Sequence, residues 1–131
     1  KIARENSNSL VTGNRLTGKR EKNAMPFLNR LGNLLFSYLW SILTISKPID
    51  VLCGIKIFPK TLFQDVHENN LEIDKYGDIS LLFAARKRKI EIYSVPVNYR
   101  CRNYGMSNIP ILSGGANLFK TTLVSWYRNI K

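Results

Sequence analysis

The strongest constraint on the fold is the run at residues 90–99, where apolar and polar side chains alternate in part as they do along a β-strand. Its apolar members are Ile90, Ile92, Val95 and Val97. Pro96 has no backbone N–H to give to a neighbouring strand, so we expect this strand at a sheet edge or at a bulge. Further strand and helix patterns along the chain favour an α/β fold with three or so short strands and flanking helices.

Two arginines follow this strand directly. If the backbone stays extended, Arg100 and Arg102 point to the same side. Two guanidinium groups on one face suit a phosphate or pyrophosphate, because each can bind oxyanions through two N–H groups. Gly105 would let the loop turn or approach a ligand closely. A basic surface strand followed by a turn is the alternative interpretation.

The remaining pattern predicts six more elements. Strands are expected at 10–12 and 55–58, and helices from 26 to about 45 and at 59–66, 79–88 and 116–130. Within the first helix Gly32 predicts a close packing contact. That helix also has one narrow polar line, made of Asn29, Asn33, Ser37 and Ser41. Its other sides are apolar and need a covering of protein or lipid.

The overall charge indicates an anionic partner. Twenty basic and nine acidic residues give the 131-residue chain a net charge of +11, which points to nucleic acid, an acidic membrane surface or phosphorylated ligands. The longest uncharged apolar run, 31–46, is shorter than the ~20 residues that a bilayer crossing needs. Two cysteines do not suggest a disulfide scaffold. Because residue 1 is lysine, we expect it to be an internal position of a longer protein.

Four motifs in order carry a resemblance to a known family. They are Gly13-Asn14-Arg15, MPFLNRLGN at 25–33, DVLCGIKIF at 50–58 and VPVNYRCRNYGMS at 95–107. From about residue 10 to 118 this order resembles the C-terminal half of family 2 glycosyltransferases of the polyprenyl-phosphate type. The resemblance implies the C-terminal part of a GT-A (Rossmann-like) domain, with 1–131 as one partial domain. It also implies transfer of a sugar from a nucleotide-sugar to polyprenyl phosphate at the cytoplasmic face of a membrane.

The resemblance also implies roles for single residues. Arg15 would face the lipid phosphate or sugar site, and Asn29 and Arg30 would receive the acceptor phosphate at a helix N-terminus, where free N–H groups attract anions. Ordinary surface arginines and helix capping are the alternatives. Arg100 and Arg102 would hold the donor pyrophosphate. Arg20 could contribute to the acceptor loop.

Asp50 has two interpretations that the sequence leaves open. It could orient the acceptor or act as a catalytic base, although a phosphate acceptor is already ionised at neutral pH. It could instead cap a turn or pair with Arg15 or Arg30. Cys53 has no histidine partner, so it is expected to be a small packing residue.

The chain departs from the family pattern at several points. Ser80 stands where glutamate is common, and Asn108 where lysine is frequent. No Asp-x-Asp motif is present, so the ligands of the Mg²⁺ or Mn²⁺ that the resemblance implies are expected mainly in a preceding half. We therefore expect no metal site in these residues, His67 included, and no transferase activity from this piece alone.

Membrane contact is expected at two places. The basic run Arg86-Lys87-Arg88-Lys89 suits an anionic membrane surface, although a nucleic-acid patch is an alternative. The segment 110–131, with Trp126 and Tyr127, suits a helix in the headgroup layer, with core packing as its alternative. We expect no nucleic-acid partner, because the aromatic residues are not interleaved with the basic runs. A saccharide acceptor remains the other open function.

Overall fold

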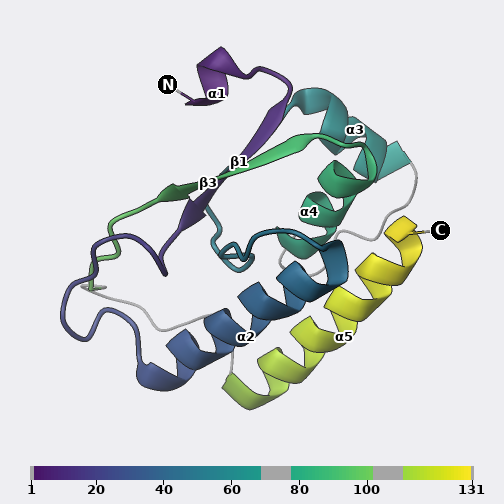
Figure 1. Cartoon of the computed structure of the whole chain (residues 1–131). Coiled ribbons are helices and arrows are strands. Elements are labelled where there is room, and N and C mark those ends of the chain that lie inside the picture. Colours follow the sequence, from purple (N-terminus) through teal and green to yellow (C-terminus); the bar gives the residue numbers. More distant parts are fainter. Residues whose placement is uncertain (1, 69–77, 102–110, 131) are drawn as a thin grey trace.

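The computed structural model describes residues 2–68, 78–101 and 111–130 (Figure 1). In chain order its elements are α1 (Ile2–Glu5), β1 (Ser9–Asn14), α2 (Phe27–Thr44), β2 (Lys56–Ile57), α3 (Lys60–Glu68), α4 (Asp78–Lys87), β3 (Glu91–Pro96) and α5 (Ile111–Ile130). Every predicted strand and helix is therefore present, with shifted ends.

β1 is the central strand of a three-stranded sheet of order β2-β1-β3. It runs parallel to β3, with Leu10 opposite Ile92, and antiparallel to β2, with Val11 opposite Ile57. In the described sheet β3 is thus an edge strand, as Pro96 predicts. The mixed sheet with flanking helices confirms the α/β fold, and it is consistent with a partial Rossmann-like domain.

The helices α2 to α5 gather on one side of this sheet (Figure 1). Leu10 of β1, Leu62 of α3 and Leu82 of α4 have no exposed surface and belong to one apolar cluster. Trp40 of α2 joins it through Phe83, with ring centroids 5.0 Å apart. Burial of each large apolar side chain contributes about 1.5–3 kcal/mol, so this cluster attaches the helices to the sheet.

Two predicted boundaries were wrong for identifiable reasons. The strand predicted at 90–99 ends at Pro96, because its partner β1 ends at Asn14, the residue opposite Pro96. The helix predicted from 116 begins at Ile111. The pair Gly114-Gly115 lowers helix propensity, but Gly114 is buried within the helix, and the packing of α5 against α4 compensates.

α2 turns its polar line toward the protein. Asn33 and Ser37 are buried, and the Nδ2 of Asn33 donates to the Sδ of Met25 at 3.4 Å. The apolar residues of the opposite side are exposed. Among the described residues the close contact predicted at Gly32 is absent, because none of their atoms beyond the helix's own backbone and the chain neighbours lies within 4 Å of a Cβ placed there.

The second half of α5 likewise turns polar side chains toward the protein and exposes apolar ones. Its buried residues in the second half are polar, namely Thr122, Ser125 and Asn129. Phe119 and Leu123, whose spacing places them on the same side of the helix as Trp126, are exposed. Trp126 is half-buried, and its Nε1 donates to the backbone oxygen of Leu43 at 3.0 Å, so α5 and α2 are joined directly.

Candidate functional site

The carboxyl ends of β1 and β3 and the start of α2 lie at the same end of the molecule, on the left in Figure 1. Parallel pairing of β1 and β3 brings their carboxyl ends together, and ligands collect at such ends in α/β sheets. Asn14 closes β1: its Oδ1 accepts the backbone N–H groups of Leu16 and Thr17 at 2.9 and 3.2 Å. Its Nδ2 donates to the Oγ of Ser94 on β3 at 3.0 Å.

The turn made by Asn14 directs Arg15 onto Asp50. The Nε of Arg15 lies 2.7 Å from Oδ2 of Asp50, and its NH2 lies 2.8 Å from Oδ1. The backbone N–H of Arg15 donates to Oδ2 as well, at 3.0 Å. Asp50 is completely buried, and the Arg15 side chain is 16% exposed. Of the two arginines considered as partners of Asp50, the structure selects Arg15.

The ion pair also sets the electrostatics of Arg15. Burial by itself would lower the pKa of this guanidinium. The hydrogen bond to Asp50 and its negative charge outweigh that effect, so the pKa of Arg15 lies above its ordinary value. The guanidinium is therefore a permanent and fixed charge at this end of the sheet.

Tyr99 connects Arg15 to the chain segment that leads to α2. The Cζ of Arg15 lies 5.6 Å from the centroid of the Tyr99 ring, within cation–π range. The backbone N–H of Tyr99 donates to the oxygen of Lys19 at 2.9 Å, and that of Glu21 donates to the oxygen of Tyr99 at 3.1 Å. Segment 19–21 therefore lies beside the chain that follows β3.

Gly18 permits this close approach. A Cβ at position 18 would lie 1.9 Å from the backbone oxygen of Val97, a distance that no side chain can take. Gly13 is similar, because a Cβ there would lie 2.9 Å from the Sγ of Cys53. The small size of Gly13, Gly18 and Cys53 is therefore a packing requirement of the site.

A hollow of about 550 Å³ opens beside this segment, which we call the basic hollow. It is lined by Arg20, Glu21, Lys22, Asn23, Met25, Pro26, Phe27 and Arg30. Three of these residues are cations and one is an anion. The hollow also adjoins the N-terminus of α2, whose N-cap Pro26 provides no side-chain hydrogen bond. Free N–H groups and the helix dipole add to its preference for anions.

The predicted site residues fall at different distances from this hollow. Arg30 lines it, and Arg15 is linked to it through Tyr99 and segment 19–21. Asn29 is half-buried and is not among the lining residues. Arg100 is exposed next to Tyr99, and Arg102 lies outside the described residues.

Two cations of the basic hollow were not assigned from the sequence. Arg20 was named only as a possible contributor to the acceptor loop, and Lys22 was given no role. Both belong to the charged stretch 17–23 between two motifs. Its position directly before the helix N-terminus at Pro26 is the signal that could have identified them.

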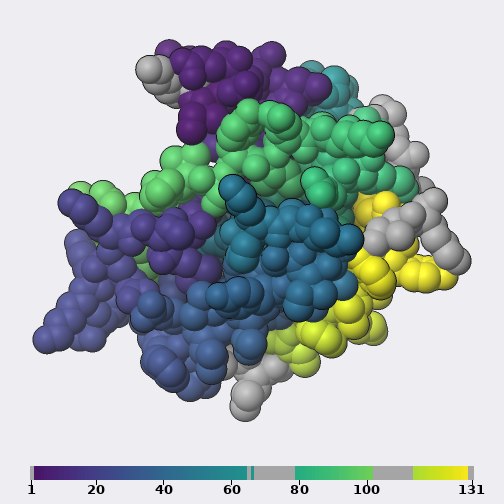
Figure 2. Space-filling model, in the orientation of Figure 1, coloured from purple at the N-terminus to yellow at the C-terminus, as the bar shows by residue number. Residues whose placement is uncertain are grey.

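An apolar surface adjoins the basic hollow along α2. Exposed apolar residues are also present on α5, which lies beside α2 along the lower edge of the molecule (Figure 2). We call it the apolar face; its exposed members are Phe27, Leu28, Leu31, Leu35, Tyr38, Ile42, Phe119, Leu123, Val124 and Tyr127. Phe27 belongs to both the hollow and the apolar face, so a cationic site and an apolar surface are continuous.

Membrane crossing and metal binding have no candidates in the described part of the chain. No helix there combines the length and apolar character needed to cross a bilayer. Nor do His, Cys, Asp and Glu side chains gather there in a group of three that could hold a metal ion.

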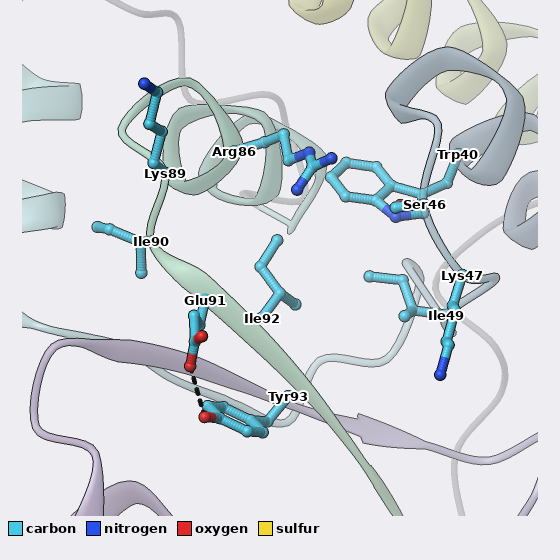
Figure 3. Close-up of a pocket in the computed structure, with 10 residues that line it drawn as sticks. All are labelled: Trp40, Ser46, Lys47, Ile49, Arg86, Lys89, Ile90, Glu91, Ile92 and Tyr93. Atoms are coloured by element: carbon cyan, nitrogen blue, oxygen red, sulfur yellow. Dashed lines mark hydrogen bonds between the residues drawn. The ribbon is translucent and has the colours of Figure 1, made fainter.

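A second hollow, of about 600 Å³, lies at the amino end of β3 (Figure 3). Trp40, Ile49, Ile92 and Arg86 point toward its centre, whereas Lys47 and Lys89 stand at its rim and point away. Arg86 already donates to the backbone oxygen of Thr44 at 3.1 Å. None of the predicted site residues lines this hollow, so the basic hollow at the other end of the sheet is the better candidate.

Two known sugar transferases are similar to this chain. The chain is 31% identical over 113 residues to a dolichyl-phosphate hexose transferase of Haloferax volcanii, covering 86% of this chain and 46% of that protein. It is 27% identical over 119 residues to a UDP-N-acetylglucosamine–dolichyl-phosphate N-acetylglucosaminyltransferase of Methanococcus voltae, covering 90% of this chain and 47% of that protein. The chain thus spans about half the length of these relatives. No family model and no solved structure matches it.

Proposed function

We propose that this chain, which is similar to two dolichyl-phosphate sugar transferases, forms the acceptor side of a family 2 glycosyltransferase. The whole protein would move a sugar from a nucleotide-sugar to a polyprenyl phosphate at the cytoplasmic face of a membrane. One observation carries the proposal: the basic hollow at the start of α2 is continuous with the apolar face. A phosphate on a long hydrocarbon chain has the same two parts.

The acceptor phosphate would bind in the basic hollow. Arg20, Lys22 and Arg30 provide positive charge there, and the uncapped first turn of α2 provides backbone N–H donors. The isoprenoid chain would leave over Phe27 and continue along the exposed apolar residues of α2. Each isoprene unit removed from water contributes by its buried apolar area, at about 25 cal/mol per Å².

Arg15 would assist from the side of the sheet. Asp50 uses the Nε and one NH2 donor of this guanidinium, which leaves the N–H groups of NH1 for an oxyanion. Because Asp50 is buried and holds Arg15 with both oxygens, we assign it a positioning role in place of general base. An ionised phosphate needs no base to attack the anomeric carbon.

The donor side is proposed on the resemblance alone. Arg100 and Arg102 would hold the pyrophosphate of the nucleotide-sugar, and the nucleoside diphosphate would leave as the phosphate oxygen bonds to the sugar. A divalent ion, Mg²⁺ or Mn²⁺, would neutralise the leaving diphosphate and would be held by residues outside this chain. Fixed cations of this kind lower the barrier by stabilising the charge that develops.

The apolar face of α2 and α5 would lie in the headgroup layer of the membrane. Besides the buried Trp40 and Leu118, its helices expose many apolar side chains, which is unfavourable in water unless that side is covered. Tyr38 and Tyr127 suit the interface between hydrocarbon and water, and Lys120 and Arg128 add positive charge for acidic lipids. This arrangement would bring the basic hollow to the height of a lipid phosphate.

The test is sugar transfer to polyprenyl phosphate by the intact protein. Arg30→Ala should raise the KM for the acceptor at least tenfold, since it removes a charged hydrogen-bond donor worth about 1.5–3 kcal/mol. Arg4→Ala is the matched control, because Arg4 is exposed on α1 and does not line the basic hollow. An unchanged KM in Arg30→Ala, or transfer to free saccharides alone, would contradict the proposal. The 131-residue chain by itself should give no transfer.

A further inference from the structure

Glu21 is an unexpected residue in a hollow proposed to bind phosphate. It is the one carboxylate among the described residues that line the basic hollow. Its Oε2 accepts the backbone N–H of Cys101 at 2.8 Å. Within the described part of the chain, no ion pair joins it to Arg20, Lys22 or Arg30. The carboxylate is thus held by the chain that follows β3, and the three cations stay available.

We propose that Glu21 is a positioning residue that makes binding in the basic hollow depend on the docking of segment 97–101. This rests on the proposed function. While the backbone N–H of Cys101 donates to Glu21, the carboxylate is held by this bond and does not pair with the three cations of the basic hollow. When segment 97–101 moves away, the freed carboxylate pairs with a cation of the basic hollow and repels an incoming phosphate. An anionic acceptor therefore binds well in the docked state only.

The contacts around Glu21 make docking a single event. The backbone of Tyr99 bonds to Lys19 and to Glu21, and the Sγ of Cys101 donates to the oxygen of Lys22 at 3.2 Å. These bonds join segments 19–22 and 97–101, which are about 80 residues apart in sequence, so they form or break together.

Segment 97–101, which binds the Glu21 carboxylate, also contains Arg100, one of the two arginines proposed for the donor pyrophosphate. A donor that keeps segment 97–101 in place would therefore keep Glu21 engaged and favour the acceptor. By linkage, a bound acceptor favours the docked segment by the same factor. Glu21 gives the two substrate sites a shared contact.

The experiment removes the backbone N–H of residue 101 and leaves the carboxylate of Glu21 intact. Cys101→Pro lacks the backbone N–H, and Cys101→Ala, the matched control, keeps it. Farnesyl phosphate serves as the probe, with its affinity for the intact protein measured by calorimetry. Both variants lack the Sγ contact to Lys22, so we expect Cys101→Pro to bind about fivefold more weakly than Cys101→Ala or worse, the size expected for one like charge near the ligand.

The decisive variant is the double substitution Glu21→Gln with Cys101→Pro. If the freed charge causes the loss, this variant should recover the affinity of Glu21→Gln alone. Failure to recover would mean that proline only distorts the main chain, and it would overturn the proposal.

If Cys101→Pro does not fold, Glu21→Asp replaces it, since the shorter side chain keeps the charge but falls short of the Cys101 N–H. It too should lose about fivefold in affinity, and an unchanged affinity would overturn the proposal. Absence of farnesyl phosphate binding in the natural protein would instead contradict the acceptor site itself, so the two failures are distinguishable.

Discussion

Arg15 and Asp50 are 35 residues apart in sequence and are joined by two side-chain hydrogen bonds of 2.7 and 2.8 Å. A third bond, from the backbone N–H of Arg15, ties the same carboxylate to the end of β1. This geometry fixes a guanidinium at the end of the sheet where the chain turns toward the basic hollow. It also occupies both oxygens of the buried acid.

Loss of the acid should destabilise the fold. Asp50→Asn leaves the largely buried Arg15 without its counter-charge, which typically costs about 3 kcal/mol or more. Urea unfolding of the intact protein measures this loss. The double variant Asp50→Asn with Arg15→Met is the control and should recover part of the stability, because it removes the unpaired charge. A cost within experimental error for Asp50→Asn would show that the pair does not support the fold.

The sign of the pH dependence follows from the same pair. Since the pKa of Arg15 is raised above its ordinary value in the folded protein, its contribution to stability is complete below that ordinary value and is lost only as the pH rises through the folded-state pKa. The stability difference between the natural protein and Arg15→Met should therefore not fall between neutral pH and strongly alkaline pH. A decline in that range would contradict the raised pKa.

Gly18→Ala should disrupt the contact between segments 19–22 and 97–101. The new Cβ would meet the backbone oxygen of Val97 at 1.9 Å, so the main chain has to move, at a typical cost of about 1–3 kcal/mol. Gly54→Ala is the matched control, because nothing lies within 4 Å of a Cβ there. Thermal unfolding of both variants makes the comparison. Equal melting temperatures would mean that the segments do not pack as described.

Leu35→Ser should weaken binding to lipid vesicles with little effect on folding, since Leu35 is 62% exposed at the centre of the apolar face. Loss of one leucine from the hydrocarbon boundary costs about 1.5–3 kcal/mol, or about tenfold or more in partition. Ile57→Ser changes a residue of similar exposure on β2 and should leave vesicle binding unchanged. If both variants bind alike, α2 is not the membrane-facing helix.

Arg102→Ala should impair sugar transfer by the intact protein while the unfolding transition stays in place. The expected reason is loss of a bidentate contact to the donor pyrophosphate. Steady-state kinetics with varied nucleotide-sugar measures the effect, and Arg4→Ala again serves as the exposed control. A transfer rate equal to that of the natural protein would remove Arg102 from the donor site.

The high positive charge should favour binding to anionic membranes over binding to nucleic acid. At physiological salt we expect binding to anionic liposomes to exceed binding to single-stranded DNA, because apolar contacts add to the charge only on the liposome. A salt titration of both ligands tests this, since binding through phosphate contacts alone falls steeply with salt. Tighter and less salt-dependent binding to DNA would favour the nucleic-acid alternative.

The elements of the fold follow from local patterns. Alternation identifies β3, Pro96 places it at a sheet edge, and proline and the apolar run identify α2. These features depend on neighbours within a few residues, so they can be predicted without tertiary contacts. The family resemblance came from the order of four motifs and is supported by the two relatives.

The orientation of the helices could not be predicted in this way. Asn33, Ser37 and Ser125 are buried and Leu35, Ile42 and Phe119 are exposed, the reverse of what the pattern of a water-soluble helix indicates. Periodicity shows which residues share a side of a helix, but it does not show which side meets the protein. When an apolar environment outside the protein can cover one side of a helix, the apolar side can face outward and the polar side can face the protein.

The amino-acid sequence by itself therefore determined the order and type of the elements, the excess of positive charge and the family resemblance, because each depends on residue identity and near spacing. Only the tertiary structure decided that Asp50 holds Arg15, that Tyr99 lies beside segment 19–21 and that Glu21 meets Cys101. These pairs join residues 35 to 80 positions apart, and the two that involve segment 97–101 form when parallel pairing brings the ends of β1 and β3 together. No local sequence pattern predicts contacts between residues this far apart in the chain.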